Sequence, residues 1–330
     1  MTHQISFGRH SLDINPEKEC QSIVEQLKQI VHTTLHRQGA VMGISGGIDS
    51  SVVLALSARA FGPEHVIGVL LPESESSDDS ARLAHVLAAQ LGVQTVTENI
   101  SGALQGFGCY NRRDAAIQRV IPEYQPGWGA KISLAGNLLT QAALNVFRVT
   151  VTSPAGHEIS KRLPMPEFSQ IVAASNFKQR SRMSMLYYHA ELRNYAVMGT
   201  ANKNEYDLGF FVKYGDGGVD TQPIGHLFKT QVYQLAKYLN IPEEIQQRTP
   251  TTDTYPGGST QEEFFYRVPF EILDAVWLGY EQEVNQADIA QALGLAGDQV
   301  ERIISDIASK KRATTYLRMQ PLSITGQPIH

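Results

Sequence analysis

Residues 40–51 read AVMGISGGIDSS, and this stretch decides how the chain folds. Its apolar start has the length of a short buried strand, Ser45-Gly46-Gly47 forms a tight turn, and an apolar helix-forming run continues to residue 61. Strand, loop and helix in this order bring free backbone N–H groups and the positive end of the helix dipole to one point. The stretch therefore predicts an anion site, where the glycines allow the backbone to approach phosphate oxygens closely.

The alternation of strand and helix continues on both sides of this loop. We expect helices at 16–37, 49–61, 78–91, 181–193 and 230–239, and strands at 40–44, 66–71, 93–100 and 195–199. Strands that alternate with helices are typical of an α/β fold. The sequence thus predicts a doubly wound parallel sheet with helices on both faces.

Two regions do not follow this alternation. Residues 101–178 are interrupted by glycine and proline, and we interpret them as an insertion or lid, with an apolar run at 134–146 that we expect to be helical. Residues 270–330 contain three short helical patterns, at 270–279, 288–293 and 299–311. We expect one domain over 1–330, of which 270–330 is a small C-terminal helical extension.

Composition excludes several classes of protein. A chain of 330 residues with 42% hydrophobic and 18% charged residues is typical of a globular protein, and its net charge of −5 does not favour nucleic acid as a partner. Cys20 and Cys109 form no C-x-x-C, which argues against a disulfide framework or a thiolate zinc site. The apolar runs are too short to cross a bilayer and the N-terminus is polar. We therefore expect a cytoplasmic protein that binds neither nucleic acid nor membrane.

The loop fits more than one chemistry. As a phosphate site, Ser45 and Ser50 would donate hydroxyl hydrogen bonds, and Asp49 would hold a Mg²⁺ that bridges phosphate oxygens. Residues 43–47 also satisfy the G-x-S-x-G pattern of a hydrolase, in which Ser45 is the nucleophile and His226 an available base. A tight glycine turn with a solvent-facing Asp49 is the structural alternative. The Walker pattern G-x-x-x-x-G-K-[ST] is absent, so the loop is not a P-loop.

Residues 45–50, SGGIDS, resemble the pyrophosphate-binding loop of the N-type ATP pyrophosphatases, which form adenylates. Six further blocks resemble the NAD synthetases, in order along the chain: 176–183, 199–205, 213–224, 229–232, 250–253 and 309–312. The chain as a whole is similar to the ammonia-dependent NAD synthetases. This resemblance implies an adenine nucleotide alpha-hydrolase-like fold, ATP as co-substrate and Mg²⁺ as the metal.

The resemblance also implies roles for individual residues. The residues assigned to ATP are Gly43, Ile44, Ser45, Gly46, Gly47, Ile48, Asp49, Ser50, Thr200, Lys229 and Thr251. Those assigned to deamido-NAD are Arg180, Lys213, Asp220, Lys310 and Lys311, and the magnesium carboxylates are Asp49 and Glu205. For the chemistry, Lys229 would neutralise charge on the phosphates, and Asp216 would select or deprotonate ammonium. The structural alternative for Asp216 is an Asx-type turn.

The implied reaction is the amidation of deamido-NAD by ammonia through an acyl-adenylate, with release of pyrophosphate and AMP. The first strand of the nucleotide fold begins near residue 40, which leaves no room for the glutaminase domain of glutamine-dependent relatives, so we expect free ammonia or a separate ammonia-donating protein. Resemblance further implies a homodimer. The alternatives are a ligase for another carboxylate, the Ser45 hydrolase, a tRNA-thiolating enzyme and a nucleotide-binding module without activity. The missing C-x-x-C pair and the acidic charge disfavour thiolation, and the presence of Asp49, Glu205 and Lys229 disfavours an inactive module.

Overall fold

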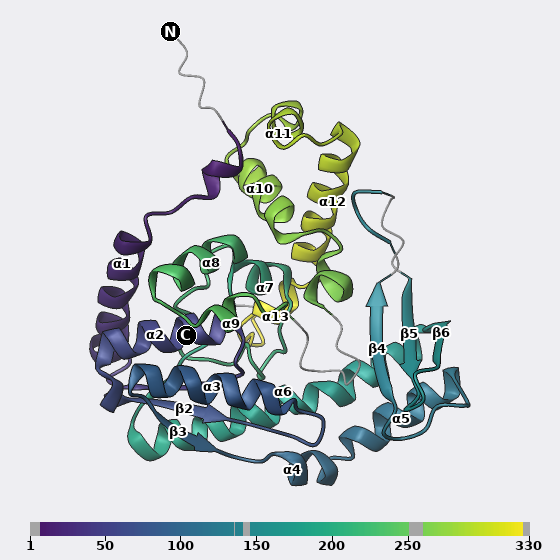
Figure 1. Cartoon of the computed structure of the whole chain (residues 1–330), viewed down its shortest axis with the longest axis horizontal. Helices are drawn as coiled ribbons and strands as arrows, with labels where there is room; N and C mark the ends of the chain where they lie inside the picture. The colour runs from purple at the N-terminus through teal and green to yellow at the C-terminus, as the bar shows by residue number, and fades with distance from the viewer. Residues whose placement is uncertain (1–6, 135, 141–145, 251–259, 326–330) are drawn as a thin grey trace.

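The computed structural model describes residues 7–134, 136–140, 146–250 and 260–325, and its larger sheet has four strands, of which β2 and β3 are labelled at the lower left of Figure 1. The strands are β1 (Ala40–Gly43), β2 (Val66–Leu70), β3 (Gln94–Thr97) and β7 (Ala196–Val197), in the order β3-β2-β1-β7. All three pairings are parallel, with Ala40 opposite Val66 on one side and Ala196 on the other. The predicted parallel sheet is confirmed, although β3 and β7 are shorter than the sequence suggests.

Helices cover both faces of this sheet. Alternate residues of β1 point to opposite sides, so Met42 packs in one core with Val52, while Val41 packs in another with Leu186. The first core receives α1 (Pro16–Lys28), α2 (Ile48–Phe61), α3 (Asp78–Leu91) and α8 (Lys229–Tyr238), and the second receives α4 (Ser101–Gly106) and α6 (Met165–Arg193). Because both faces are covered, β2 is buried throughout and reads as a continuous apolar run. The doubly wound α/β fold is confirmed.

The region from residue 101 has a sheet of its own. It contains α4, α5 (Cys109–Val120), β4 (Gly129–Leu134), β5 (Phe147–Thr152) and β6 (Glu158–Arg162), and the three strands are antiparallel in the order β4-β5-β6. The predicted helix over 134–146 is wrong for the described residues, because Leu134 ends β4 and residues 138–140 form a turn. The remainder of that run, at 135 and 141–145, lies outside the described residues. Pairing of β4 with β5 buries Ala130, Ile132, Val149 and Val151 on one face, and this period of two overrides the helical pattern.

Helix α6 connects the small sheet to the large one. It begins at Met165, where the sequence predicts a start near 181, and its 29 residues extend about 43 Å. Pro164 and Pro166 flank its first residue, a position where proline starts helices well. Figure 1 shows α6 running from the side of β4–β6 to the side of β2 and β3. The interpretation of 101–178 as an insertion or lid of a single domain over 1–330 remains a prediction.

The C-terminal residues form a group of helices with a separate core. They are α10 (Phe270–Glu281), α11 (Gln286–Leu293), α12 (Gly297–Ala313) and α13 (Thr315–Arg318), of which the first three were expected. Fully buried Trp277 packs there with Val300 and Ile303. The remaining short segments are η1 (Arg9–Leu12), η2 (Gln29–Thr34), η3 (Pro63–His65), α7 (Lys203–Leu208), α9 (Glu243–Gln246) and η4 (Glu262–Tyr266). Among the described residues, none of the helices has the length and apolar character needed to cross a membrane.

Candidate active site

A pocket of about 1000 Å³ opens where β1 and β2 end. This is the edge of an open parallel sheet at which ligands of α/β proteins usually bind. Every residue of the predicted phosphate loop lines the pocket except Gly46. At Gly46, φ is +69°, and a Cβ atom would lie 2.6 Å from the backbone oxygen of Ser80, so only glycine fits there.

Hydroxyl groups and a helix N-terminus meet at this loop. The Oγ atoms of Ser45 and Ser50 are 3.2 Å apart, and the Ser50 hydroxyl donates to the Gly47 carbonyl at 3.0 Å. Gly47 is the N-cap of α2 and provides no side chain to bond the first N–H groups of that helix. These N–H groups therefore remain available to an anion, as the sequence predicts.

The described residues place no histidine base beside the Ser45 hydroxyl, which a hydrolase with Ser45 as its nucleophile would need. Within the described part of the chain, the Ser45 hydroxyl contacts the Ser50 hydroxyl at 3.2 Å and accepts from the Gly47 N–H at 3.3 Å, and neither partner is a histidine. His226 instead pairs with Glu19 at 2.7 Å, where its side chain is 55% exposed. The geometry thus does not support nucleophilic catalysis by Ser45.

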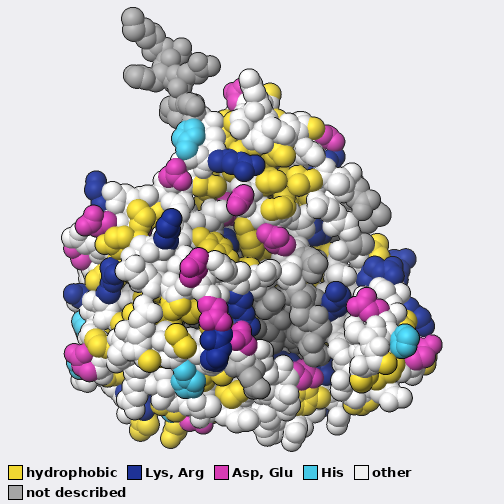
Figure 2. Space-filling view, viewed as in Figure 1, with side chains coloured by type: hydrophobic (Ala, Val, Ile, Leu, Met, Phe, Trp, Pro, Cys, Tyr) yellow, Lys and Arg dark blue, Asp and Glu magenta, His cyan; other side chains and the backbone are white. Residues whose placement is uncertain are grey.

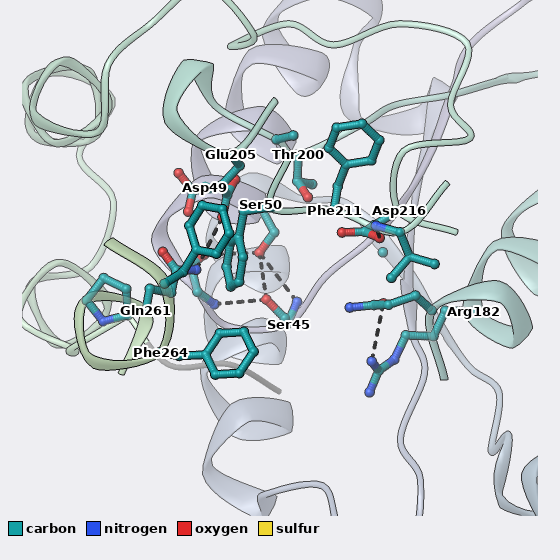
Figure 3. A pocket seen from close by; sticks show the side chains of 18 of the residues that line it. Ser45, Asp49, Ser50, Arg182, Thr200, Glu205, Phe211, Asp216, Gln261 and Phe264 are labelled. Atoms are coloured by element: carbon teal, nitrogen blue, oxygen red, sulfur yellow. Dashed lines mark hydrogen bonds between the residues drawn. The ribbon is translucent and has the colours of Figure 1, made fainter. Parts of the chain in front are cut away.

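A buried lysine and two carboxylates lie next to the loop, and Figure 3 shows the carboxylates, Asp49 and Glu205, near Ser50. Lys229, whose side chain is 1% exposed, donates a hydrogen bond to Asp49. Asn202 joins Asp49 to Glu205: its side-chain amide donates to Asp49 at 3.0 Å, and its backbone N–H donates to Glu205 at 3.1 Å. The sequence expects these charged residues to act together, and the fold brings them into one group.

This group contains two carboxylates, Asp49 and Glu205, and one cation, Lys229. Burial, and then the negative charge of Asp49, raise the pKa of Glu205 above its ordinary value. Burial lowers the pKa of Lys229, but the charges of Asp49 and Glu205 outweigh it and raise that pKa overall. A cation beyond Lys229 would relieve the repulsion between the two carboxylates.

Asp216 faces the same pocket from the turn after Phe211 (Figure 3). Its carboxylate accepts a hydrogen bond from the Val212 N–H at 2.8 Å, so it also stabilises the turn. Burial raises the pKa of Asp216 to about 6, against the opposing effects of the Val212 N–H and the charge of Arg182. Asp216 therefore both stabilises the turn and lines the pocket.

The remaining residues assigned to ATP and one assigned to deamido-NAD are placed as follows. Thr200 lines the pocket, and Thr251 lies outside the described residues. Lys310 lines the pocket as well, where it donates to Asp306 and to the Phe265 carbonyl, both at 2.6 Å. Burial lowers the pKa of Lys310 in spite of the Asp306 charge.

The other four residues assigned to deamido-NAD do not line this pocket. Arg180 donates to the Lys213 carbonyl at 3.3 Å, and Lys213 itself donates to the carbonyls of Tyr316 and Met319. Asp220 accepts from the Val197 N–H at 2.7 Å and fixes the short strand β7, whereas Lys311 pairs with Glu281. Their roles toward a dinucleotide remain predictions.

Sequence reasoning missed several residues that line the pocket. Asn176, Gln179 and Arg182 come from α6, and Arg248 comes from the segment after α9. Asn176 and Arg182 belong to the block at 176–183, from which only Arg180 was assigned. Helical spacing offers the missing signal, because Arg180 and Arg182 are two positions apart on a helix and cannot share a face.

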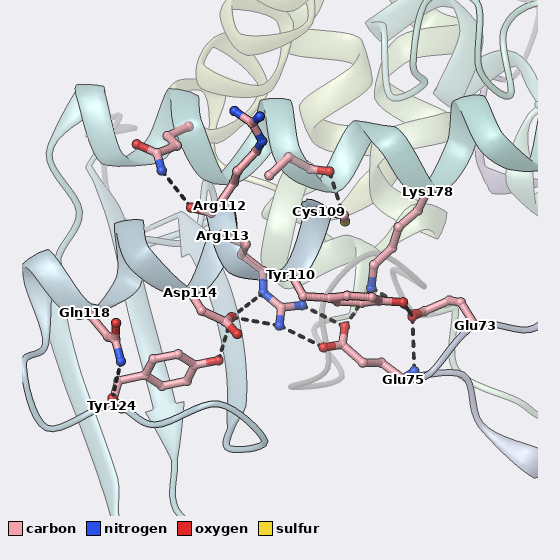
Figure 4. A network of polar contacts seen from close by, with 12 residues as sticks. Glu73, Glu75, Cys109, Tyr110, Arg112, Arg113, Asp114, Gln118, Tyr124 and Lys178 are labelled. Atoms are coloured by element: carbon pink, nitrogen blue, oxygen red, sulfur yellow. Dashed lines mark hydrogen bonds and ion pairs between the residues drawn. The ribbon is translucent and has the colours of Figure 1, made fainter. Parts of the chain in front are cut away.

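The pocket wall that follows β2 is held by a second buried network (Figure 4). Lys178 donates to Glu73 at 2.9 Å and to Glu75 at 2.7 Å, and Arg113 of α5 binds Glu75 with both terminal nitrogens. The Glu73 backbone N–H in turn donates to the hydroxyl of Ser76, which lines the pocket. The network therefore fixes the loop at 72–77 between α5 and α6.

The residues present fit one mode of metal binding. The described residues contain no group of three or more His, Cys, Asp or Glu side chains placed around one point. Asp49 and Glu205 instead offer two hard carboxylates beside a phosphate loop. Mg²⁺ is commonly held by one or two carboxylates together with substrate phosphates and water, which suits this pair.

Fold and pocket together define a class of protein. The chain is an α/β protein with a parallel sheet, and its pocket lies at the carboxyl ends of β1 and β2, where ligands of open α/β sheets bind. A glycine and serine loop that is not a Walker loop lines this pocket beside a buried lysine and two carboxylates. This agrees with the adenine nucleotide alpha-hydrolase-like fold that the resemblance implies.

The sequence profile of the NAD synthase family matches residues 19–120 and 130–319, and the chain belongs to this family. The NH(3)-dependent NAD(+) synthetase of Mesorhizobium japonicum is 45% identical over 94% of this chain and 97% of its own length. The protein of the same name from Rhizobium meliloti is 43% identical over 99% of this chain and 97% of its own length. The family predicted from the ordered blocks is confirmed.

Solved structures share the fold at lower identity. The NH3-dependent NAD synthetase of Campylobacter jejuni has a TM-score of 0.61 and 23% identity, and covers 94% of this chain and 100% of its own. The NMN synthetase of Francisella tularensis has a TM-score of 0.60 and 24% identity, and covers 94% of this chain and 99% of its own. One fold therefore occurs in proteins named for a dinucleotide and for a mononucleotide product.

Proposed function

We propose that this chain is a ligase that converts deamido-NAD to NAD with ammonia, at the expense of ATP. The observation that carries the proposal is the group formed by Asp49, Lys229, Asn202 and Glu205 at the phosphate loop, of which Asp49, Lys229 and Glu205 line the pocket of about 1000 Å³. Relatives at 43–45% identity bear the name NH(3)-dependent NAD(+) synthetase, which supports the same reaction. ATP is the co-substrate.

The first step overcomes the low reactivity of a carboxylate toward ammonia. A carboxylate oxygen of deamido-NAD attacks the α-phosphorus of ATP, and the bond from that phosphorus to the bridging oxygen breaks, so pyrophosphate leaves. The uncapped N-terminus of α2 and the hydroxyls of Ser45 and Ser50 receive the pyrophosphate. Lys229 would neutralise negative charge that develops on the phosphates, and its ion pair with Asp49 beside the phosphate loop supports this role.

The second step forms the amide. Ammonia attacks the carbonyl carbon of the acyl-adenylate, AMP leaves with one of the original carboxylate oxygens, and one proton is lost from nitrogen. We assign to Asp216 the selection of ammonium and the acceptance of this proton; its place in the pocket lining and its pKa, which burial raises to about 6, support the assignment. The turn function of Asp216 keeps its carboxylate in place through the Val212 N–H.

Further residues complete the proposal. Asp49 and Glu205 would hold Mg²⁺, which would supply Lewis acid chemistry to the phosphates when bound. Thr200 and Thr251 belong to the ATP site, and Arg180, Lys213, Asp220, Lys310 and Lys311 to deamido-NAD. The proposal includes a homodimer in the cytoplasm that uses free ammonia or ammonia from a separate protein.

The test is product stoichiometry with purified protein. Deamido-NAD, ATP and Mg²⁺ are incubated with and without ammonium, NAD is followed with an alcohol dehydrogenase couple, and AMP and pyrophosphate are measured in the same samples. We expect equal amounts of NAD, AMP and pyrophosphate, and no NAD without ammonium. Formation of ADP, or pyrophosphate release that deamido-NAD does not stimulate while another carboxylic acid does, would contradict the proposal.

A further inference from the structure

Arg248 brings a positive charge to the pocket next to the phosphate loop. It follows α9, lines the pocket and is partly buried. One of its terminal nitrogens donates to the Ser80 hydroxyl of α3 at 2.8 Å. The backbone oxygen of Ser80 lies against Gly46, where a Cβ atom would approach it to 2.6 Å. A single residue, Ser80, therefore separates the guanidinium of Arg248 from the turn of the loop.

Contacts between α3 and the chain around α9 hold Arg248 in this place. Arg82 of α3 forms an ion pair with Glu244 of α9, and the side-chain amide of Gln90 donates to the Asn240 carbonyl at 2.9 Å. Figure 2 shows acidic and basic side chains side by side on the surface over α3 and α9. These contacts are exposed and add little stability, but they fix where the end of α9 lies relative to α3. Arg248 is therefore held at the loop by contacts on either side of it.

Arg248 differs from Arg267 in its electrostatic partners. Arg267 also lines the pocket, but it forms an ion pair with Asp306 that compensates its charge. Across the described ranges of the chain, no carboxylate pairs with Arg248, and the Ser80 hydroxyl that it contacts is neutral. A guanidinium carries several N–H donors in a planar fork, which matches the oxygens of a phosphate group. With one bond to Ser80, this fork still has donors for an anion in the pocket.

Two cations approach the loop at different residues. Lys229 reaches it at Asp49, in the first turn of α2, whereas Arg248 reaches it beside Gly46, in the turn that precedes the helix. Lys229 already pairs with Asp49, so part of its charge is compensated within the protein. Pyrophosphate carries several negative charges, and a guanidinium is well suited to bind more than one of its oxygens. Arg248 therefore supplies positive charge that Lys229 alone does not.

We propose that Arg248 binds the β- and γ-phosphates of ATP at the loop and holds the pyrophosphate that leaves in the first step. This inference rests on the proposed function, because it takes that reaction to release pyrophosphate at Ser45 and Ser50. As the bond from the α-phosphorus to the bridging oxygen breaks, the electron pair stays on that oxygen, and the negative charge of the leaving group grows. A guanidinium that donates to the leaving group stabilises this charge more in the transition state than in bound ATP. Arg248 is thus a further catalytic residue of the reaction.

The experiment measures equilibrium binding of two products, pyrophosphate and AMP, each with Mg²⁺, by titration calorimetry of the wild type, Arg248→Lys and Arg248→Met. AMP lacks the two phosphates assigned to Arg248, so its Kd reports damage to the rest of the pocket. For Arg248→Met we expect the Kd of pyrophosphate to rise about tenfold or more, as loss of a charged hydrogen-bond donor predicts, and the Kd of AMP to stay within about twofold. Arg248→Lys should recover part of the affinity, because it restores the charge without the fork.

Steady-state kinetics give a second readout on the same proteins. In Arg248→Met, the KM for ATP and the inhibition constant of pyrophosphate should rise together, because both ligands carry the phosphates assigned to Arg248. The KM for deamido-NAD should not change. A purely structural role of Arg248 would not separate pyrophosphate from AMP, or ATP from the acid.

Two further variants serve as controls. Ser80→Ala removes the hydroxyl that orients Arg248, so affinity for pyrophosphate should fall, but less than in Arg248→Met. Arg302 is also partly buried and does not line the pocket, so Arg302→Met should leave the Kd of both products unchanged. An unchanged Kd of pyrophosphate in Arg248→Met, or an equal loss for both products, would overturn the inference. A wild type that forms no NAD but binds pyrophosphate more tightly than Arg248→Met does would contradict the proposed function and leave the assignment of Arg248 standing.

Discussion

Two lysines of this molecule are equally buried and differ in what surrounds them. The side chains of Lys178 and Lys229 are each 1% exposed. Lys178 lies between Glu73 and Glu75 in a network that also contains Arg113 (Figure 4). Lys229 instead bonds Asp49 at the pocket, and Figure 3 shows Glu205 close to Asp49. Burial alone therefore does not distinguish a structural charge from a functional one.

The pKa values of Glu75 and Glu205 shift in opposite directions in the two groups. Burial opposes ionisation of Glu75, but hydrogen bonds and charges from Arg113 and Lys178 lower its pKa below the ordinary value. At Glu205, burial and the charge of Asp49 act in the same direction and raise the pKa. In the first group two cations, Lys178 and Arg113, both bind Glu75, whereas in the second the single cation Lys229 pairs with Asp49 and Glu205 lies beside a like charge. A site that must bind a cation and phosphates is expected to look like the second.

The largest effect on activity should come from Lys229→Met. Removing the ammonium group takes away a fixed positive charge from the proposed phosphate site, so kcat/KM should fall by about a thousandfold. The side chain of Asp49 is 15% exposed to the pocket, so its unpaired charge remains partly solvated and the loss of stability should be modest. Steady-state kinetics and thermal unfolding of the same preparation check both statements. A variant that keeps a tenth or more of the wild-type kcat/KM would remove Lys229 from the chemistry.

Lys178→Met should show the reverse pattern. It leaves the carboxylate of Glu73, which is 1% exposed, without its lysine, and the free energy of unfolding should fall by about 3–5 kcal/mol. Activity of the folded fraction should fall less than tenfold, since Lys178 does not line the pocket. Denaturant unfolding gives the first quantity, and the double variant Lys178→Met with Glu73→Gln serves as control, because it removes one uncompensated charge and should recover part of the stability. An unchanged unfolding midpoint would contradict the role of this network.

Asp216→Asn should produce a smaller, pH-dependent effect on stability. The folded-state pKa of about 6 lies above the value of about 3.9 for an unfolded chain, so the folded protein binds more protons between these values. Wild-type stability therefore decreases relative to the variant as the pH rises from about 4 through 6, by on the order of 1–2 kcal/mol. The free energy of unfolding of both proteins, measured at about pH 4.5 and about pH 8, gives this change. A difference between them that does not change with pH would mean that Asp216 ionises as an exposed carboxylate does.

The smallest effect is expected for His226→Ala. His226 is mostly exposed and paired with Glu19, away from the Ser45 hydroxyl, so formation of NAD and thermal stability should stay close to wild type. Steady-state kinetics of NAD formation measures the first. Loss of activity comparable to that of Lys229→Met would reopen the hydrolase interpretation of Ser45.

The parts of the fold that the sequence predicts well are local. The stretch at 40–51 specifies strand, turn and helix within a dozen residues, and the structure reproduces it as β1, the loop and α2. The small sheet was missed because β4 and β5 depend on pairing between strands, and Gly129 of β4, for example, pairs with Thr152 of β5, which is 23 positions away. No single window of the chain carries that information.

The site shows the same limit. Asp49, Glu205, Lys229 and Asp216 were expected from short motifs, and the structure places them around one pocket. The start and orientation of α6 decide which arginine of the 176–183 block faces this pocket. The sequence predicted a start sixteen residues too late. The apolar lining from Phe147 and Phe168 also depends on that helix, which is why the inserted region had no assigned chemistry.

The measurement that tests the central claim most directly follows the oxygen atoms of the acid. Deamido-NAD whose carboxylate carries heavy oxygen is turned over with ATP, Mg²⁺ and ammonium, and the products are separated and weighed by mass spectrometry. An acyl-adenylate predicts that AMP receives one labelled oxygen while NAD retains the other and pyrophosphate carries none. Label in inorganic phosphate or pyrophosphate, or AMP without label, would contradict the account of this pocket as an adenylate-forming site.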